Sequence, residues 1–408
     1  MKILLIGSLI SEKEMEMINN NSIEKASVAP LNYETMLVKG LMENGVDVEA
    51  LSVPAVASYP NSKFKFIEEK KEIIFDSILV KWIPFINIQG IKQYTIERNT
   101  KKLLKEWLKK NQHIKDKVVL MYSIYPPYSK SAISLCKQFH CHLSTVIADL
   151  PEYMYTWKNL KGLRKIYADK ISKEMLNLQK KCDSYILFTK PMAVKMGIAN
   201  KPFIVSEGFS DNSVFKRINN VEKYDKKTIV YGGNLSKLYG IQNLVNAFFN
   251  TNIDAELHIY GAGLDADYVK EYAKKDPRIK FKGRVNREEL LLALKKAHLL
   301  IINKPTSDDY SNYSFSSKIL EYMVSGTPVL MTKVGGMPIE YYDYLYFIEN
   351  ESIEGVQKAI EDIILLKNEE LDKKGIIAKK FAEKEKNYKS MTKKIVEFLS
   401  KQINGEIQ

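Results

Sequence analysis

The feature that most constrains this chain is a repeated alternation of short apolar runs with helix-like segments. Apolar runs stand at residues 2–7 (KILLIG), 117–124 (KVVLMYSI) and 142–150 (HLSTVIADL), and an amphipathic pattern over 33–44 follows the first of them. Short buried runs separated by helices are typical of βαβ units. The sequence therefore predicts a parallel sheet.

The same alternation begins again after a polar stretch near residue 205, with apolar runs at 227–233 (KTIVYGG), 255–261 (AELHIYG) and 327–332 (TPVLMT). A chain of 408 residues is long for one hydrophobic core and comfortable for two. We therefore predict an α/β protein with two tandem Rossmann-like, doubly wound parallel-sheet domains. Such sheets bind ligands beyond the carboxyl ends of their strands, so we expect a substrate site in the cleft between the domains.

The net charge of +13 is concentrated in the first half, where residues 1–200 contain 30 Lys+Arg and 20 Asp+Glu. This excess favours an anionic partner, namely nucleic acid, anionic lipid or a phosphorylated substrate; the alternative is mere solubility. The apolar start is expected to be a buried strand rather than a signal peptide. Three cysteines, Cys136, Cys141 and Cys182, lack metal-ligand spacing and are expected to be reduced thiols.

Residues 314–330, SFSSKILEYMVSGTPVL, combine a helix start with a cation and a carboxylate. Ser316 or Ser317 is a suitable N-cap. The free backbone N–H groups of the helix start and the charge of Lys318 favour a phosphate or diphosphate. Glu321 lies one turn further on the same side and suits the hydroxyl groups of a ribose. The alternative is an ordinary capped helix with a Lys/Glu pair.

The segment SKILEYMVSGTPVL resembles the signature helix of the retaining, two-domain (GT-B) glycosyltransferases of family 4 type, the glycosyl transferases group 1. Residues 228–248 resemble the first strand, loop and helix of that family's C-terminal domain, and 257–263, 279–290 and 333–343 fall in the expected places around the helix. The resemblance implies an N-terminal acceptor-binding domain over 1–205 and a nucleotide-sugar-binding domain over 206–385. A C-terminal helix over 386–408 is expected to cross back to the first domain.

The resemblance also implies which residues bind the donor. Glu321 matches the second glutamate of the family's E-x7-E motif, which holds the ribose. The expected donor is a nucleoside-diphosphate sugar, with UDP favoured over GDP, and neither a further cofactor nor a metal is expected. The other implied donor contacts are Gly7, Gly232, Gly233, Asn234, Gly261, Gly263, Arg284, Val285, Tyr313, Ser314, Phe315, Ser316, Ser317 and Lys318.

Three positions depart from the family pattern. Tyr313 replaces the first glutamate of the motif, and Asn234 and Tyr239 replace the arginine and lysine that neutralise the diphosphate. Lys237 and Lys318 are expected to supply that charge instead, and both are predicted to be catalytic. The departures resemble a branch that is common in bacterial capsule and exopolysaccharide biosynthesis.

Asp149 is the third residue predicted to be catalytic, because family members often place a His or Asp near the reacting carbon at this strand end. The alternative is a cap for the next turn. Acceptor contacts are predicted at Tyr125, Pro126 and Tyr153. The family's usual mechanism is same-face attack assisted by the leaving phosphate, which requires no protein nucleophile. The implied acceptor is a glycan or lipid-linked glycan.

Aromatic and basic residues occur together over 153–173 and over 101–110, where Trp107 stands with Leu103 and Leu104. Both segments suit an anionic membrane surface, so we expect a cytoplasmic protein that binds peripherally to the inner face of the cell membrane. The helical stripe of the first segment favours core packing as the alternative. That stripe consists of Leu163, Tyr167, Ile171, Met175 and Leu178.

Other functions remain as alternatives. A sugar-nucleotide epimerase on a similar frame needs catalytic carboxylates and histidines around its cleft, which are scarce here. The altered positions Tyr313, Asn234 and Tyr239 also fit a degenerate, non-catalytic nucleotide binder. Nucleic-acid binding is not expected, because the lysines are dispersed and no recognition motif is present. The D-x-D at 265–267 is interpreted as a helix start rather than a metal site.

Overall fold

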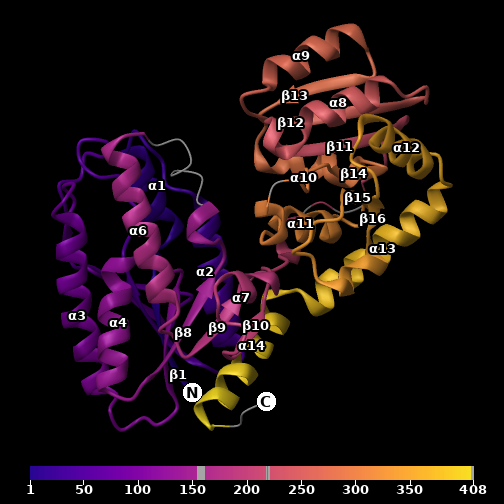
Figure 1. The fold of residues 1–408 in the computed structure, drawn as a ribbon. Coiled ribbons are helices and arrows are strands. Elements are labelled where there is room, and N and C mark those ends of the chain that lie inside the picture. Colours follow the sequence, from indigo (N-terminus) through magenta and orange to yellow (C-terminus); the bar gives the residue numbers. More distant parts are fainter. Residues whose placement is uncertain (154–160, 217, 219–220, 308, 406–408) are drawn as a thin grey trace. The chain divides into compact units, whose positions relative to one another are not determined.

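The computed structural model describes residues 1–153, 161–216, 218, 221–307 and 309–405. The chain forms two compact units (Figure 1). Unit 1 consists of Met1–Glu207 together with Tyr388–Gln408, and unit 2 consists of Gly208–Asn387. The last helix of the chain therefore belongs with the first unit.

Unit 1 is built on an eight-stranded sheet with the order β10-β9-β8-β7-β1-β2-β5-β4. Its neighbouring strands are parallel except for the pair β4 and β5 at one edge. A separate two-stranded sheet pairs β3 with β6. The strands are β1 (Lys2–Gly7), β2 (Asp47–Ser52), β3 (Phe66–Ile67), β4 (Lys71–Ile74), β5 (Ile78–Trp82), β6 (Phe85–Ile86), β7 (Lys117–Tyr122), β8 (His142–Ile147), β9 (Ser184–Leu187) and β10 (Phe203–Val205).

Helices cover both faces of this sheet. From β1 the chain moves to β2 on one side, whereas the connections from β7 to β8 and from β8 to β9 move toward the other edge of the sheet. Because such crossovers are right-handed, the helices of the two sets lie on opposite faces of the sheet. Helices α3, α4 and α6 lie side by side on one face, and α2 packs with α14 (Figure 1). The helices are α1 (Glu12–Asn20), α2 (Val28–Glu43), α3 (Lys92–Lys110), α4 (Pro126–Gln138), α6 (Leu163–Gln179), α7 (Pro191–Lys195) and α14 (Tyr388–Ile403), and a 3-10 turn η1 covers Pro151–Tyr153.

The contact between α2 and α14 is close and specific. Asn44 Nδ2 donates to Lys389 O and to Thr392 Oγ1, each at 3.0 Å. A Cβ atom on Gly40 would lie 2.4 Å from Thr392 Oγ1, so only glycine allows α14 to approach α2 this closely.

Unit 2 is built on a six-stranded parallel sheet with the order β13-β12-β11-β14-β15-β16. Its strands are β11 (Lys227–Asn234), β12 (Ala255–Ala262), β13 (Ile279–Gly283), β14 (Leu299–Ile302), β15 (Val329–Thr332) and β16 (Tyr346–Ile348). Its helices are α8 (Ile241–Phe249), α9 (Ala266–Lys275), α10 (Arg287–Lys296), α11 (Ser317–Ser325), α12 (Ile353–Ile364) and α13 (Asn368–Glu385), with 3-10 turns η2 (Asn212–Phe215), η3 (Lys237–Tyr239), η4 (Asp309–Asn312) and η5 (Ile339–Tyr344).

The prediction of two doubly wound parallel-sheet domains is confirmed. The short helix α1 and the antiparallel edge at β4 were not predicted. In the described part of the chain, no helix has both the length and the apolar character needed to cross a membrane.

One expectation for the membrane-facing segments is wrong. Trp107, Leu103 and Leu104 are 6%, 4% and 0% exposed, so they pack in the core of unit 1 and cannot face a lipid surface. On α6, Met175 is buried as the core alternative requires, whereas Tyr167 is 56% exposed. Residues 154–160 of the aromatic and basic segment 153–173 lie outside the described residues.

Candidate functional site

The donor residues that the sequence predicts in unit 2 gather where the strand order reverses. From β11 the chain moves through β12 to β13, returns to β14 on the other side of β11, and continues to β15. The carboxyl ends of β11 and β14 thus form the switch point at which doubly wound sheets bind ligands. Gly232 and Gly233 lie among the last three residues of β11, and α11 begins after β14.

Close backbone contacts at this edge require glycine. Gly261 on β12 is paired with Gly233 on β11 and has a φ of 135°. A Cβ atom there would lie 1.8 Å from Gly233 O, so no other residue allows the two strand ends to remain in place. Gly263 makes a similar approach, because its Cβ atom would lie 2.2 Å from Leu235 O.

Helix α11 is tied to the end of β11 by one buried tyrosine. The hydroxyl of Tyr322 accepts a hydrogen bond from Gly232 N at 2.9 Å and donates to Gly232 O at 3.1 Å. At the start of the helix, Ser316 occupies the N-cap position, but its side chain makes no capping hydrogen bond. At the other end, Gly326 has a φ of 80°. The helix start therefore keeps backbone N–H groups that its own cap does not satisfy.

Lys318 extends from the first turn of α11 to the end of β11. Its Nζ atom lies 1.9 Å from the place that a Cβ atom on Gly233 would occupy, and 5.6 and 5.7 Å from the ring centroids of Tyr231 and Tyr239. Burial lowers the pKa of Lys318, and the nearby charge of Glu321 partly opposes this. Among the described residues, the ammonium group has neither a hydrogen bond nor an ion pair. An unpaired cation in this position favours an anionic ligand.

Glu321 lies one turn after Lys318, with its side chain 19% exposed. Its Oε1 atom is 2.6 Å from Nη2 of Arg287, the first residue of α10, whose side chain is 58% exposed. The contact is not directed as a hydrogen bond, so Oε1 is left without a hydrogen-bond donor in the described part of the chain. A ligand hydroxyl group could donate to this oxygen in place of the exposed arginine side chain.

The other predicted donor residues take different positions. Lys304 Nζ donates to Ser314 Oγ at 2.6 Å, and Phe315 packs in the core against Tyr341 with ring centroids 5.2 Å apart. Phe315 therefore anchors the start of α11 in the hydrophobic core of unit 2. Asn234, Lys237, Arg284 and Ser317 are exposed, Val285 and Tyr313 are partly buried, and Tyr239 is 41% exposed.

The D-x-D at 265–267 behaves as expected for a helix start. Asp265 occupies the N-cap position of α9 and accepts a hydrogen bond from Gln242 Nε2 at 2.9 Å, while Asp267 pairs with Lys270 at 2.8 Å.

Unit 1 has its own switch point, between β1 and β7, and a buried carboxylate occupies it. Glu34 on α2 is 0% exposed. Its two oxygens accept hydrogen bonds from Ser8 N at 3.0 and 2.9 Å, and Oε1 also accepts from Ser8 Oγ at 2.7 Å. A Cβ atom on Gly7 would lie 2.3 Å from Oε2, so only glycine leaves space for the carboxylate here. This contact explains why glycine occupies a position at which the sequence predicted a donor contact.

The sequence analysis did not select Glu34, although a signal was present. Glu34 lies on the same stripe of α2 as Leu37, Val38 and Leu41, all of which are buried. An acidic residue within an apolar stripe indicates a buried carboxylate with local hydrogen-bond donors.

The predicted acceptor-side residues surround the same strand ends. Asp149 follows β8 and is exposed, and its charge contributes to raising the pKa of Tyr122 at the end of β7, where burial is the main cause. Tyr125 and Pro126 begin α4, and the ring of Tyr125 contacts that of Tyr128 edge-on at 5.5 Å. Tyr153 ends η1 and is partly buried.

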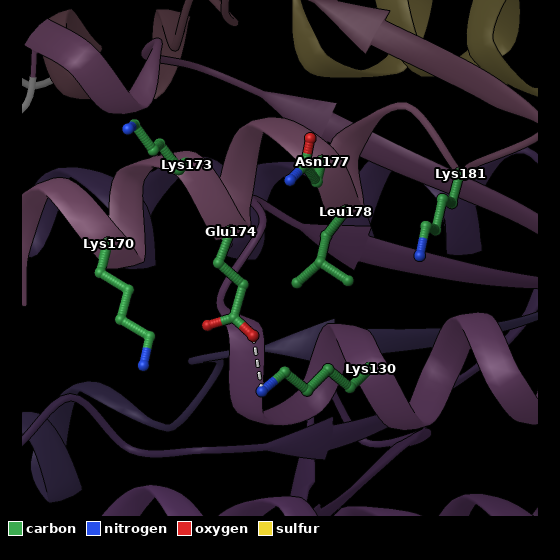
Figure 2. Close-up of a pocket in the computed structure, with 7 residues that line it drawn as sticks. All are labelled: Lys130, Lys170, Lys173, Glu174, Asn177, Leu178 and Lys181. Carbon is green, nitrogen blue, oxygen red and sulfur yellow. Dashed lines mark ion pairs between the residues drawn. The ribbon is translucent and has the colours of Figure 1, made fainter.

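A basic hollow of about 480 Å³ lies between α4 and α6 (Figure 2). Four lysines line it, Lys130, Lys170, Lys173 and Lys181, with Glu174 as its acidic residue. Figure 2 shows Glu174 between the ammonium groups of Lys130 and Lys170, and it pairs with Lys130 at 2.7 Å. Much of the excess positive charge of this lining is therefore uncompensated.

Comparison with known proteins gives one family match and one curated relative. Residues 214–381 match the family Glycosyl transferases group 1. N-acetyl-alpha-D-glucosaminyl L-malate synthase of Bacillus anthracis is 32% identical over 153 residues, which are 36% of this chain and 38% of that protein. The matched stretch thus spans less than half of that relative's length.

Solved structures share the fold over the full chain. Sucrose-phosphate synthase from Thermosynechococcus elongatus has a TM-score of 0.64 and 14% identity, covering 100% of both chains. HepE of Anabaena in complex with UDP has a TM-score of 0.61 and 14% identity, covering 98% of this chain and 100% of that one. This chain therefore has the two-unit parallel-sheet fold of the GT-B glycosyltransferases, and its residues 214–381, which contain Lys318 and Glu321, match the family Glycosyl transferases group 1.

Proposed function

We propose that this protein is a retaining glycosyltransferase that takes its sugar from a nucleoside-diphosphate sugar, with UDP favoured. The observation that carries the proposal is the pair formed by Lys318 and Glu321 on α11. One is a largely buried cation with no hydrogen bond or ion pair in the described part of the chain, and the other is a carboxylate with an oxygen that accepts no hydrogen bond there. A nucleoside diphosphate has complementary groups at this spacing, namely phosphates and ribose hydroxyls.

The chemistry requires stabilisation of the departing diphosphate as the bond between sugar and phosphate breaks. Lys318 and the free N–H groups at the start of α11 supply fixed positive charge, which does not have to reorganise during the reaction. The ribose hydroxyls donate to Glu321 and displace Arg287. In the same-face mechanism, the acceptor oxygen attacks the anomeric carbon and its proton passes to an oxygen of the leaving phosphate. Lys237 is proposed as a second cation, and Asp149 as the residue near the reacting carbon.

Thermal stability with a ligand panel tests the donor class. The panel consists of UDP, GDP, CMP, ADP and NAD. A ligand that binds only the folded state raises the melting temperature by an amount that grows with concentration over Kd. We expect UDP to give the largest shift and Glu321→Ala to lose most of it, because the ribose then lacks its acceptor.

The matched control is Glu354→Ala, an exposed glutamate in the first turn of α12, which is expected to keep the full UDP shift. A shift with NAD and none with any nucleoside diphosphate would contradict the proposal. UDP binding without sugar transfer in the presence of membrane extract would instead support the non-catalytic nucleotide binder, which Tyr313, Asn234 and Tyr239 motivate.

We further propose that the acceptor is a lipid-diphosphate-linked glycan of bacterial surface polysaccharide synthesis, reached from the cytoplasmic side at the membrane surface. The lysine-lined hollow between α4 and α6 supports an anionic surface as partner, and Tyr167 and Ile166 on α6 are 56% and 66% exposed beside these lysines. Exposed aromatic and aliphatic side chains next to lysines suit the headgroup region.

Co-sedimentation with vesicles tests the membrane proposal. The double variant Lys170→Gln and Lys173→Gln is expected to bind anionic vesicles at least tenfold more weakly than wild type, since each lysine near such a surface contributes about 1 kcal/mol. The control variant, Lys358→Gln with Lys380→Gln, removes two exposed lysines from unit 2 and should bind as wild type does. Equal binding of the wild type to neutral and anionic vesicles would refute the proposal.

A further inference from the structure

Cys136 and Cys141 close the carboxyl end of α4. His140 lies between them in the left-handed region, with a φ of 48°, and Cys141 N donates to Cys136 O at 2.9 Å. This is a Schellman motif, in which the N–H group after the left-handed residue bonds a carbonyl five residues back, and the two bonded residues commonly bring their side chains together. In this chain both side chains are thiols, and Cys141 Sγ also lies 3.7 Å from Lys117 O and 3.8 Å from His142 O.

Covalent geometry limits the distance between these two residues. The path from the Cα atom of Cys136 to its carbonyl oxygen is about 2.4 Å, and the N–Cα bond of Cys141 adds about 1.5 Å. With 2.9 Å between N and O, the two Cα atoms lie at most about 6.8 Å apart, and a bent path makes the distance shorter. Disulfides join Cα atoms that are about 4.4–6.8 Å apart. The separation of the two Cα atoms therefore does not exceed the range that a disulfide spans.

The two thiols differ in character. Interaction with the Cys136 thiol and the positive charge of Lys117 lower the pKa of Cys141, although burial opposes this. The same interaction together with burial raises the pKa of Cys136. Cys141 is therefore the thiol that ionises first and attacks an oxidant, and Cys136 is placed to resolve the product.

Cys136 and Cys141 are 2% and 5% exposed, and a hollow beside them opens to solvent. Both cysteines line an open hollow of about 870 Å³ at the amino end of β8, together with Lys115, Lys117 and Lys137. Cys182 is the internal comparison, because it is 0% exposed and burial raises its pKa to about 12. In the described residues, no group of three or more His, Cys, Asp or Glu side chains is arranged to hold a metal, so a metal site does not account for the pair.

We propose that Cys136 and Cys141 form a dithiol that a hydroperoxide oxidises to a disulfide. The Cys141 thiolate attacks one peroxide oxygen; an S–O bond forms, the O–O bond breaks, and the leaving alkoxide or hydroxide takes up a proton. The Cys136 sulfur then attacks the sulfur of the sulfenic acid. An S–S bond forms, and the hydroxyl group leaves as water with the Cys136 proton. Two thiols are thus oxidised while one peroxide is reduced. The site lies at the amino edge of the sheet, opposite the switch point of unit 1.

Peptide mapping of the full-length protein tests the proposal. Lys137 separates the two cysteines, so trypsin releases Cys136 in the peptide 131–137 and Cys141 in the peptide 138–158. After treatment with hydrogen peroxide, we expect a non-reduced digest to contain these two peptides joined, with the loss of two hydrogen atoms, and dithiothreitol to separate them. The wild-type digest alone decides the pairing, so the result does not depend on the folding of a variant.

Two variants extend the test. Cys182→Ser is expected to oxidise as the wild type does. Cys136→Ser is expected to stop at a sulfenic acid on Cys141 that dimedone traps. A link to the peptide 182–195, or no oxidation at a peroxide concentration that oxidises N-acetylcysteine in the same tube, would overturn the proposal. Neither outcome depends on glycosyltransferase activity.

Discussion

Lys318→Met is expected to lower kcat/KM for the sugar donor by about 100-fold or more, the loss seen when one preorganised charge-stabilising donor is removed from an active site. Methionine keeps the apolar stem in contact with Tyr231 and Tyr239 but removes the charge. Lys237, the second cation that we propose for the diphosphate, is exposed to solvent, so its charge replaces that of Lys318 only in part. The measurement is steady-state transfer from UDP-sugar donors, together with UDP affinity.

The same substitution is expected to leave the ligand-free protein as stable as wild type, or more stable. A largely buried ammonium without a hydrogen-bond partner among the described residues costs free energy, and methionine relieves that cost. Lys358→Met is the matched control in unit 2, and its kcat/KM and its ligand-free stability should both equal those of the wild type. Lys318→Met with turnover within threefold of wild type would exclude Lys318 as the main phosphate-facing charge.

Glu34→Gln is expected to abolish a fall in stability that the wild type shows as pH rises. Burial raises the pKa of Glu34 from 4.5 to about 7, although hydrogen bonds from Ser8 and Leu9 act in the opposite direction. Between these two values the folded state binds more proton than the unfolded state, so stability decreases with increasing pH through this window. The free energy of unfolding of the wild type should fall relative to the variant by about 3 kcal/mol from pH 4.5 to pH 8.

Urea unfolding followed by tryptophan fluorescence measures this effect in the correct unit, because all three tryptophans precede residue 207. Glutamine keeps the shape of the side chain and one acceptor oxygen for Ser8. Glu16→Gln replaces an exposed glutamate of α1 and should follow the pH profile of the wild type. A constant difference between wild type and Glu34→Gln across this range would show that Glu34 does not titrate as proposed.

Several features were readable from sequence because they depend on neighbours along the chain. The strands follow from runs of buried apolar residues, and the limits of α11 follow from Ser316 before its first turn and Gly326 after its last. Lys318 and Glu321 share one side of that helix because three residues make almost one turn. Local spacing of this kind is independent of how the rest of the chain folds.

Patterns that allow two orientations were less informative. The aromatic and basic segment 101–110 was expected at a membrane surface, but it lies in α3, which turns Trp107 into the core rather than toward lipid. The hydrophobic pattern defines an apolar face. It does not say whether a sheet or another surface covers that face.

The sequence by itself determined the two-sheet architecture, the helix α11 and the spacing of its charge and carboxylate. Only the tertiary structure decided which distant groups meet them. Glu34 and Ser8 are 26 residues apart, and Arg287 and Glu321 come from different helices, so their contacts exist only because strands and helices pack in one topology. Burial then sets the chemistry, since the same carboxylate or ammonium that titrates normally in water changes its pKa when packing removes its solvent.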